Sequence, residues 1–149
     1  MLPADGYYEW MAETANGKTI KQPYYLHGGP EGLSFAALYE LWPDPARAAD
    51  DPDRWVWSAA IITCAAEGPA GEVHDRTPVI LPRDRVDAWL DPARTDPDAI
   101  AEVVTGLHPP LLGIRKVSRQ VNRVGTNGPQ LVAPLTGQTD GELQLHLAS

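Results

Sequence analysis

Short apolar runs rich in aromatic and β-branched residues alternate with turn residues along most of the chain. Runs of this length, bounded by glycine, proline and asparagine, are typical of β-strands. The pattern predicts strands over residues 6–10, 23–27, 34–42 and 55–65, with further candidates at 77–81, 114–118 and 142–147.

Two of these runs carry information about their place in a sheet. Residues 55–65 are apolar on both alternating faces, which predicts an interior strand. Pro23 has no backbone N–H, so the run 23–27 is expected at a sheet edge or at a strand start. The polar segment 44–54 separates two strands and is expected to be a loop.

Helical periodicity occurs at two places. Within residues 82–92, apolar side chains recur with helical spacing, and Asp91-Pro92 provides a stop. In the second segment Asp96 is the expected N-cap, Pro97 the first helical residue and Gly106 the C-terminal breaker. Both helices are amphipathic and are expected to cover the sheet. The predicted fold class is therefore α+β, dominated by antiparallel sheet.

The length and the residue types set further limits. A chain of 149 residues fits one domain, so 1–149 is predicted to be a single domain. An apolar run long enough to span a membrane is absent, and a soluble, cytoplasmic protein is expected. Cys64 is the single cysteine, which excludes an internal disulfide and CxxC-type zinc or redox motifs. No two histidines have close ligand spacing, so no metal is expected. The sequence contains no glycine-rich phosphate loop, and no cofactor is expected.

The net charge of −8, from 20 acidic and 12 basic side chains, has the wrong sign for a nonspecific nucleic-acid binder. The densest basic stretch contains Arg115, Lys116, Arg119 and Arg123, with no acid between positions 114 and 125. A solvated strand edge and loop is the favoured interpretation, because four cations are few for an electrostatic footprint. A phosphate track is the alternative.

Two residues are candidates for acid–base chemistry. Glu9 lies between Tyr8 and Trp10, and a carboxylate among apolar side chains has a raised pKa. On a strand, however, Glu9 points away from both neighbours and can simply face water, which is the favoured interpretation from this stretch alone. His74 stands before Asp75 and an apolar run, where it can act as acid or base or make a structural hydrogen bond.

Several motifs taken together resemble one protein family. They are "LPADGYYEW", "KQPYYLHG", "FAALYELW", "WSAAIITCAA", "VHDRTPVIL", "DAWL" and "VSRQVNRVGTNGPQLVAP". In this order they resemble the second half of the SRAP family (SOS-response-associated peptidases), over residues 2–134. These proteins protect abasic sites in single-stranded DNA by covalent capture. The resemblance implies a barrel-like, mostly antiparallel fold with short covering helices, and abasic single-stranded DNA as the partner.

The resemblance also implies roles for five residues. Glu9 matches the family's glutamate that positions an amine and moves protons, and His74 matches the histidine that assists sugar ring-opening and Schiff-base steps. Three further residues match the lining of the DNA path, where an aromatic face stacks on a base and polar groups meet phosphate: Trp10, Thr63 and Arg76.

One feature of the family's chemistry is absent from the sequence. The family uses an N-terminal cysteine, whose amine and thiol form a thiazolidine with the sugar aldehyde, whereas this sequence starts Met1-Leu2. The expectation is a truncated SRAP domain that does not crosslink as it stands, with exposed sheet edges and poor solubility. Cys64 has no α-amine available and is not a substitute. A non-catalytic module that binds single-stranded DNA or a protein partner, or an inactive remnant, are the alternatives; a general peptidase ranks below them.

Overall fold

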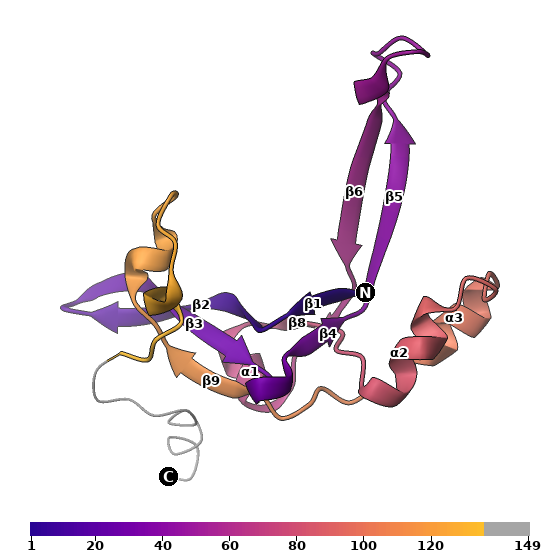
Figure 1. Cartoon of the computed structure of the whole chain (residues 1–149). Coiled ribbons are helices and arrows are strands. Elements are labelled where there is room, and N and C mark those ends of the chain that lie inside the picture. The colour runs from indigo at the N-terminus through magenta and orange to yellow at the C-terminus, as the bar shows by residue number, and fades with distance from the viewer. Residues whose placement is uncertain (136–149) are drawn as a thin grey trace. The chain divides into compact units, whose positions relative to one another are not determined.

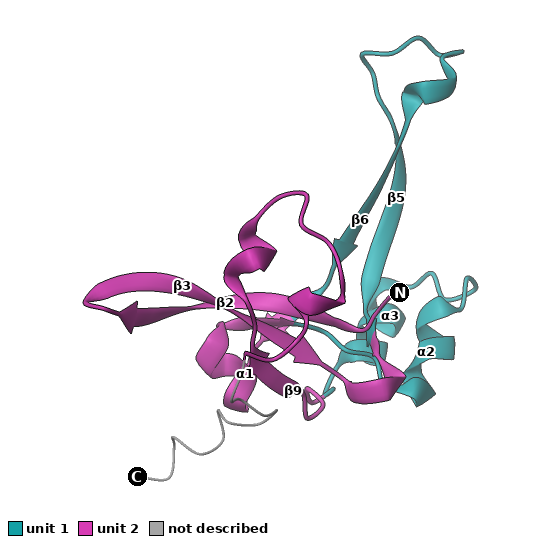
Figure 2. Ribbon diagram, turned by 60° about the vertical axis from the view of Figure 1, so that its left-hand side comes forward, with its two compact units in different colours: residues 1–2, 34–63, 78–107 teal, residues 3–33, 64–77, 108–149 magenta. Residues whose placement is uncertain are grey.

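The structure, a computed structural model, describes residues 1–135, and the chain divides into two compact units (Figures 1 and 2). Unit 1 comprises residues 1–2, 34–63 and 78–107, and unit 2 comprises residues 3–33, 64–77 and 108–149. The single-domain expectation remains a prediction. The strand expected over 142–147 lies outside the described residues.

Antiparallel strands dominate the described elements, which confirms the α+β class. They form one three-stranded sheet, β2-β3-β9, and three two-stranded ladders, β1-β4, β5-β6 and β7-β8, rather than one closed sheet. The strands are β1 (Leu2–Ala4), β2 (Gly6–Ala15), β3 (Lys18–His27), β4 (Leu33–Phe35), β5 (Ala37–Pro43), β6 (Trp55–Ile61), β7 (Thr63–Ala65), β8 (Arg76–Pro78) and β9 (Gly113–Lys116). The helices are α1 (Gly68–Val73), α2 (Arg83–Leu90), α3 (Pro97–Val104) and the 3₁₀ turns η1 (Gly29–Glu31), η2 (Pro52–Arg54), η3 (Arg119–Asn122) and η4 (Pro129–Leu131).

The sheet of unit 2 is built on the β2–β3 hairpin. Its turn is Asn16-Gly17, where both residues have positive φ angles, 50° and 71°. That conformation matches the twist of the strands, and it explains the Asn-Gly pair at this point. β2 is the outer strand, because β3 lies between β2 and β9.

Pro23 lies in the middle of the central strand β3, so its expected place at an edge or strand start is wrong. The Pro23 carbonyl accepts a hydrogen bond from Val117 N (3.1 Å), but proline cannot return one to the Val117 carbonyl. The buried Gln22 side chain makes that bond instead, with Nε2 2.9 Å from the Val117 carbonyl oxygen. A neighbouring amide therefore supplies the donor that proline lacks.

One face of this sheet carries the core of unit 2. Tyr24 and Leu26 of β3 are each 1% exposed and pack with Ile114 of β9 and Val73 of α1. Tyr7, Met11, Ala70 and Leu112 pack around that cluster. Because alternate residues of a strand share a face, the odd-numbered positions of β2 point toward α1.

Unit 1 contains the long β5–β6 hairpin, in which every residue of β6 is exposed. The prediction of an interior strand over 55–65 is therefore wrong. Its apolar residues lie on a two-stranded ladder with no third strand among residues 1–135. Tyr39 and Trp57, 76% and 72% exposed, stack on each other across the hairpin at a ring-centroid distance of 6.4 Å.

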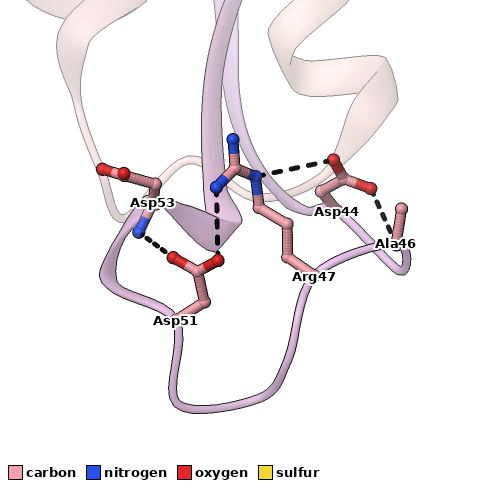
Figure 3. Close-up of polar contacts among 5 residues, drawn as sticks. All are labelled: Asp44, Ala46, Arg47, Asp51 and Asp53. Atoms are coloured by element: carbon pink, nitrogen blue, oxygen red, sulfur yellow. Dashed lines mark hydrogen bonds and ion pairs between the residues drawn. The ribbon is translucent and has the colours of Figure 1, made fainter.

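The loop at the end of this hairpin is ordered by a small polar network (Figure 3). Arg47 reaches two carboxylates, Asp51 at 3.2 Å and Asp44 at 3.9 Å. Both aspartates also accept backbone N–H groups, from Asp53 at 2.8 Å and from Ala46 at 2.9 Å respectively. These contacts are local and exposed.

Two expected strands are each broken near one end. The run 34–42 breaks at Ala36, and the run 55–65 breaks at Ile62. Val79 bonds to both: Ala36 N donates to the Val79 carbonyl and Val79 N donates to the Ile62 carbonyl, each at 2.8 Å. Ile62 N also donates to the Ala36 carbonyl at 2.9 Å, so the two residues stay in the hairpin register while their remaining backbone groups pair with the segment that follows β8.

Both predicted helices are present as α2 and α3, and Asp96 caps α3 by accepting from Asp98 N. Their main contact is with each other. That they cover a sheet remains a prediction. The sequence pattern missed α1, a six-residue helix containing Gly68, Pro69 and Gly71. No helix within residues 1–135 has the length and apolarity required to cross a membrane.

Candidate functional site

Glu9 lies on the packed face of β2, directly opposite Tyr24 of β3. Its side chain is 23% exposed, because α1 packs against β2 and covers much of this face. The carboxylate is therefore only partly solvated, and the alternative in which it simply faces water does not hold.

His74 is the residue that ends α1, with its backbone N–H bonded to the Ala70 carbonyl at 3.1 Å. Its Nε2 lies 3.9 Å from Glu9 Oε2. This separation is too long for a direct hydrogen bond, but it leaves room for a substrate oxygen or nitrogen to bond to both groups. The two residues that were predicted as the acid–base pair lie side by side.

The backbone of Arg76 contacts His74 Nδ1 through both of its polar groups. Arg76 N–H donates to Nδ1 at 3.1 Å when this nitrogen is unprotonated. The Arg76 carbonyl oxygen lies 3.2 Å from Nδ1 and accepts a hydrogen bond from it when it is protonated. Asp75 Oδ1 lies 3.2 Å from Nδ1 and is placed to stabilise the ring when it is doubly protonated.

The environment raises the pKa of Glu9 above its ordinary value of 4.5. Burial is the largest cause, because desolvation disfavours the charged carboxylate, and the Asp75 charge adds to it. His74 acts in the opposite direction and lowers the pKa. A carboxyl group with a raised pKa exchanges protons closer to neutral pH.

Tyr7 belongs to the same face of β2 and was not singled out from the sequence. Its hydroxyl is 2.9 Å from Thr77 Oγ1, a contact between residues 70 positions apart. This bond joins β2, which carries Glu9, to β8, which follows His74. Burial raises the pKa of the Tyr7 phenol, and the Glu9 charge adds to that effect. Tyr7 lies two residues before Glu9, and this strand spacing was the sequence signal that placed both side chains on one face.

A second polar cluster lies further along the same face. Glu13 accepts a hydrogen bond from the Tyr24 hydroxyl and pairs with Lys116 Nζ at 2.9 Å. Lys116 Nζ is also 5.8 Å from the centroid of the Tyr24 ring. Lys116 is therefore neutralised by a partner, which neither interpretation of the basic stretch anticipated.

Trp10 lies on the opposite face of β2 from Glu9, as strand alternation requires. Its indole Nε1 donates to Asn122 Oδ1 at 2.8 Å, and its ring centroid is 6.4 Å from that of Tyr8. Arg76 is exposed at the start of β8, two residues after His74. Thr63, exposed at the start of β7, belongs to unit 1, whereas the other four predicted site residues belong to unit 2.

Within residues 1–135, no three side chains of the His, Cys, Asp or Glu type gather as they would around a metal ion. Cys64 is half-buried and makes no disulfide. The absence of a metal or cofactor from the function remains a prediction.

The family model for SOS response associated peptidase (SRAP) matches residues 1–124. Curated relatives include abasic site processing protein YoqW of Bacillus subtilis (strain 168), 32% identical over 133 residues. Abasic site processing protein YedK of Escherichia coli (strain K12) is 26% identical over 133 residues. Each alignment covers 89% of this chain and 55% of the relative, so the chain spans about half the length of these proteins.

Two solved structures also match most of this chain over about half of their own length. A protein from Bacteroides thetaiotaomicron superposes with a TM-score of 0.70 at 25% identity, over 90% of this chain and 55% of that one. A phage-related protein from Bordetella bronchiseptica gives a TM-score of 0.56 at 38% identity, over 78% and 51% of the two chains.

Proposed function

The chain belongs to the SRAP family, and from this membership we propose that it acts on abasic sites in single-stranded DNA, with Glu9 and His74 as the proton-transfer pair. The names of the curated relatives support abasic sites as the substrate. The observation that carries the assignment of the pair is the 3.9 Å approach of His74 Nε2 to Glu9 Oε2.

The chemistry of an abasic sugar needs proton transfer at each step. Opening of the sugar ring exposes an aldehyde, an amine adds to it, and loss of water gives an imine. A thiol next to the amine then adds to the imine carbon and closes a thiazolidine, so that one aldehyde and one cysteine give one thiazolidine and one water. His74 Nε2–H is placed to protonate a departing oxygen, and the Glu9 carboxylate to accept the proton of an attacking group.

The experiment supplies cysteine as the free amino acid, because Cys64, the single cysteine of the sequence, lies within β7 and has no free α-amine. The substrate is a single-stranded oligonucleotide with one abasic site, and mass spectrometry follows the thiazolidine formed on the DNA. We expect the chain to accelerate this reaction over the rate without protein. Glu9→Gln and His74→Gln should each reduce the acceleration by about 100-fold or to the background rate.

The matched control is Asp87→Asn, which changes an exposed carboxylate on α2. This variant should retain the wild-type acceleration. Equal rates with and without the wild-type chain would refute the proposed function. Full acceleration by both the Glu9→Gln and His74→Gln variants would refute only the assignment of the pair.

A further inference from the structure

The hydrogen bonds at the two ends of the β5–β6 hairpin show which backbone groups of β6 face its outer edge. At one end Asp44 N donates to the Arg54 carbonyl at 2.9 Å, and at the other Ile62 N donates to the Ala36 carbonyl at 2.9 Å. In an antiparallel pair, only alternate residues bond to the partner strand. Even-numbered residues of β6 therefore bond to β5. The odd-numbered residues direct their backbone groups outward, and these are Trp55, Trp57, Ala59 and Ile61.

The outer edge of β6 lacks the features that usually protect a sheet edge. Among residues 1–135, β5 is the one strand that pairs with β6. Edge strands are commonly blunted by charged residues, prolines or bulges. β5 has two of these features, Glu40 and Pro43, and Pro43 removes one outward donor from its edge. The seven residues of β6, WVWSAAI, include no charge and no proline, and all are exposed. β6 is therefore the edge of this hairpin that can accept another strand.

The sequence of β6 is complementary in size to its own reverse. Large side chains occupy its first three positions, and small ones follow from Ser58 to Ala60. If two copies of β6 pair antiparallel about a two-fold axis at Ser58, each small alanine faces a large residue of the other copy. The opposed pairs are Trp55–Ile61, Val56–Ala60, Trp57–Ala59 and Ser58–Ser58.

The same register satisfies the backbone. It pairs odd-numbered residues with odd-numbered residues, which are those whose N–H and C=O groups point outward. It also gives every residue of β6 a partner within the strand. An axis at Trp57 would instead place two indoles directly opposite each other and would leave Ile61 beyond the end of the partner strand.

We propose that β6 pairs with β6 of a second copy of this chain, in antiparallel register about Ser58. The two hairpins then form one four-stranded sheet in the order β5-β6-β6-β5. This contact is closed, because both copies use the same strand and the new outer edges are the two copies of β5, which carry Glu40 and Pro43. A second copy fits better than an unrelated strand, because the size matching requires a partner with the same sequence. The inference is independent of the proposed function.

The net charge predicts how this association responds to salt. Each copy carries a charge of −8, so two copies repel each other. Glu40 is the one carboxylate within the paired hairpin strands, so the contact itself has little charge to lose. Salt screens the repulsion between copies, and the dimer should therefore become stronger as the salt concentration rises.

Sedimentation of the full chain over a range of concentrations tests for the dimer. We expect the mass to rise from 16.2 kDa toward twice that value, with a larger dimer fraction at higher salt. Ala59→Pro removes an outward N–H and leaves the bonds to β5 in place. It should weaken association about tenfold or more, because the symmetric contact loses this hydrogen bond twice. The matched control, Leu41→Pro, removes an outward N–H from β5 and should leave association unchanged.

A disulfide test reports the register. Both variants carry Cys64→Ser, which removes the single native cysteine. Ser58→Cys places the two thiols opposite each other, with a Cα separation of about 4.5 Å, typical of an antiparallel pair without hydrogen bonds between its two residues. That separation permits a disulfide. Ala60→Cys is the matched control, because its two copies lie four residues apart along the strand, about 14 Å. Under mild oxidation, Ser58→Cys should give a covalent dimer and Ala60→Cys should remain monomeric on a non-reducing gel.

Three results would overturn this inference. A wild-type chain that stays monomeric at every concentration and salt would leave the β6 edge to a different partner. A dimer that Ala59→Pro does not weaken would use another surface. Equal crosslinking of the two cysteine variants would exclude the register about Ser58. Circular dichroism verifies that each variant folds. None of these measurements involves DNA or thiazolidine formation, so each result leaves the proposed function intact.

Discussion

The β2–β3 and β5–β6 hairpins share a high content of aromatic residues but have opposite environments. Both are antiparallel and rich in aromatic residues. Leu26 on the first is 1% exposed, whereas Leu38 on the second is 56% exposed. The first hairpin has a third strand, β9, and the helix α1 packed on it, and the second has no third strand among the described residues. Burial is therefore set by what packs on a hairpin and not by its own pattern.

This difference also determines which hairpin carries the candidate site. Burial is the main reason that the pKa of Glu9 is raised, and α1 both provides that burial and delivers His74. The β5–β6 hairpin offers exposed aromatic rings, and Glu40 is the one ionisable carboxylate within its strands. A packed face is thus a condition for the proposed acid–base role of Glu9 and His74.

The largest expected difference between the two hairpins is in the cost of truncating one leucine on each. Leu26→Ala should lower the free energy of unfolding by about 2–5 kcal/mol, because it leaves a cavity in the core of unit 2. Leu38→Ala should change it by less than about 0.5 kcal/mol. Urea denaturation measures both values, and equal losses would show that the two hairpins are packed alike.

Removal of one tyrosine hydroxyl from each hairpin should give a smaller difference in the free energy of unfolding. Tyr24→Phe removes the hydrogen bond to the Glu13 carboxylate and should cost about 1.5 kcal/mol. Tyr39→Phe, on the exposed hairpin, is the matched control and should be neutral. Urea denaturation again measures the free energies of unfolding. If Tyr24→Phe leaves the free energy of unfolding unchanged, the hydrogen bond from Tyr24 to Glu13 makes no net contribution to stability.

The stability of the folded state should depend on the charge of Glu9 in a defined pH window. Its folded pKa is raised above 4.5, so the folded state binds the proton more tightly than the unfolded state. Wild-type stability should therefore fall as the pH rises from 4.5 through the folded pKa. Glu9→Gln should have a higher Tm than wild type at pH 7, and this gain should disappear below pH 4.5. A gain of equal size at pH 4 and pH 7 would contradict the raised pKa.

The smallest effect on stability is expected at the exposed hairpin. Trp57→Lys should change the free energy of unfolding by less than about 0.5 kcal/mol, because the ring is 72% exposed. The same substitution should reduce the fluorescence of a dye that binds exposed apolar surface. If the dye binds strongly and Trp57→Lys does not reduce its fluorescence, the apolar surface that the dye reports lies outside the β5–β6 hairpin.

The sequence predicted the parts of the fold that depend on local chemistry. The Asn16-Gly17 turn between two aromatic runs indicated the β2–β3 hairpin, and Asp96 with Pro97 indicated the start of α3. The pairing of Glu9 with His74 as acid and base was predicted through a family resemblance, because nothing in the local sequence joins these two residues, and the role stays a proposal. The prediction for Trp10, Thr63 and Arg76 as DNA contacts stays untested.

The features that the sequence did not predict depend on distant partners. Pro23 is tolerated inside β3 because the Gln22 amide replaces its missing donor, a contact that involves Val117. The Tyr7–Thr77 bond likewise joins residues far apart in the chain. α1 was missed because its glycines and proline are poor helix formers, and packing against β2 compensates for them.

The pH dependence of thiazolidine formation tests the central claim most directly. At each pH, the rate with the chain is divided by the rate without it, which cancels the ionisation of free cysteine. A carboxylate accepts a proton only when it is ionised, so the ratio should fall on the acidic side, at a pH above the ordinary value of 4.5 for this group. Glu9→Gln should abolish this fall, and His74→Gln should lower the ratio at every pH. A ratio that does not vary with pH, or a profile that both variants leave unchanged, would contradict the assignment of Glu9 and His74 as the proton-transfer pair.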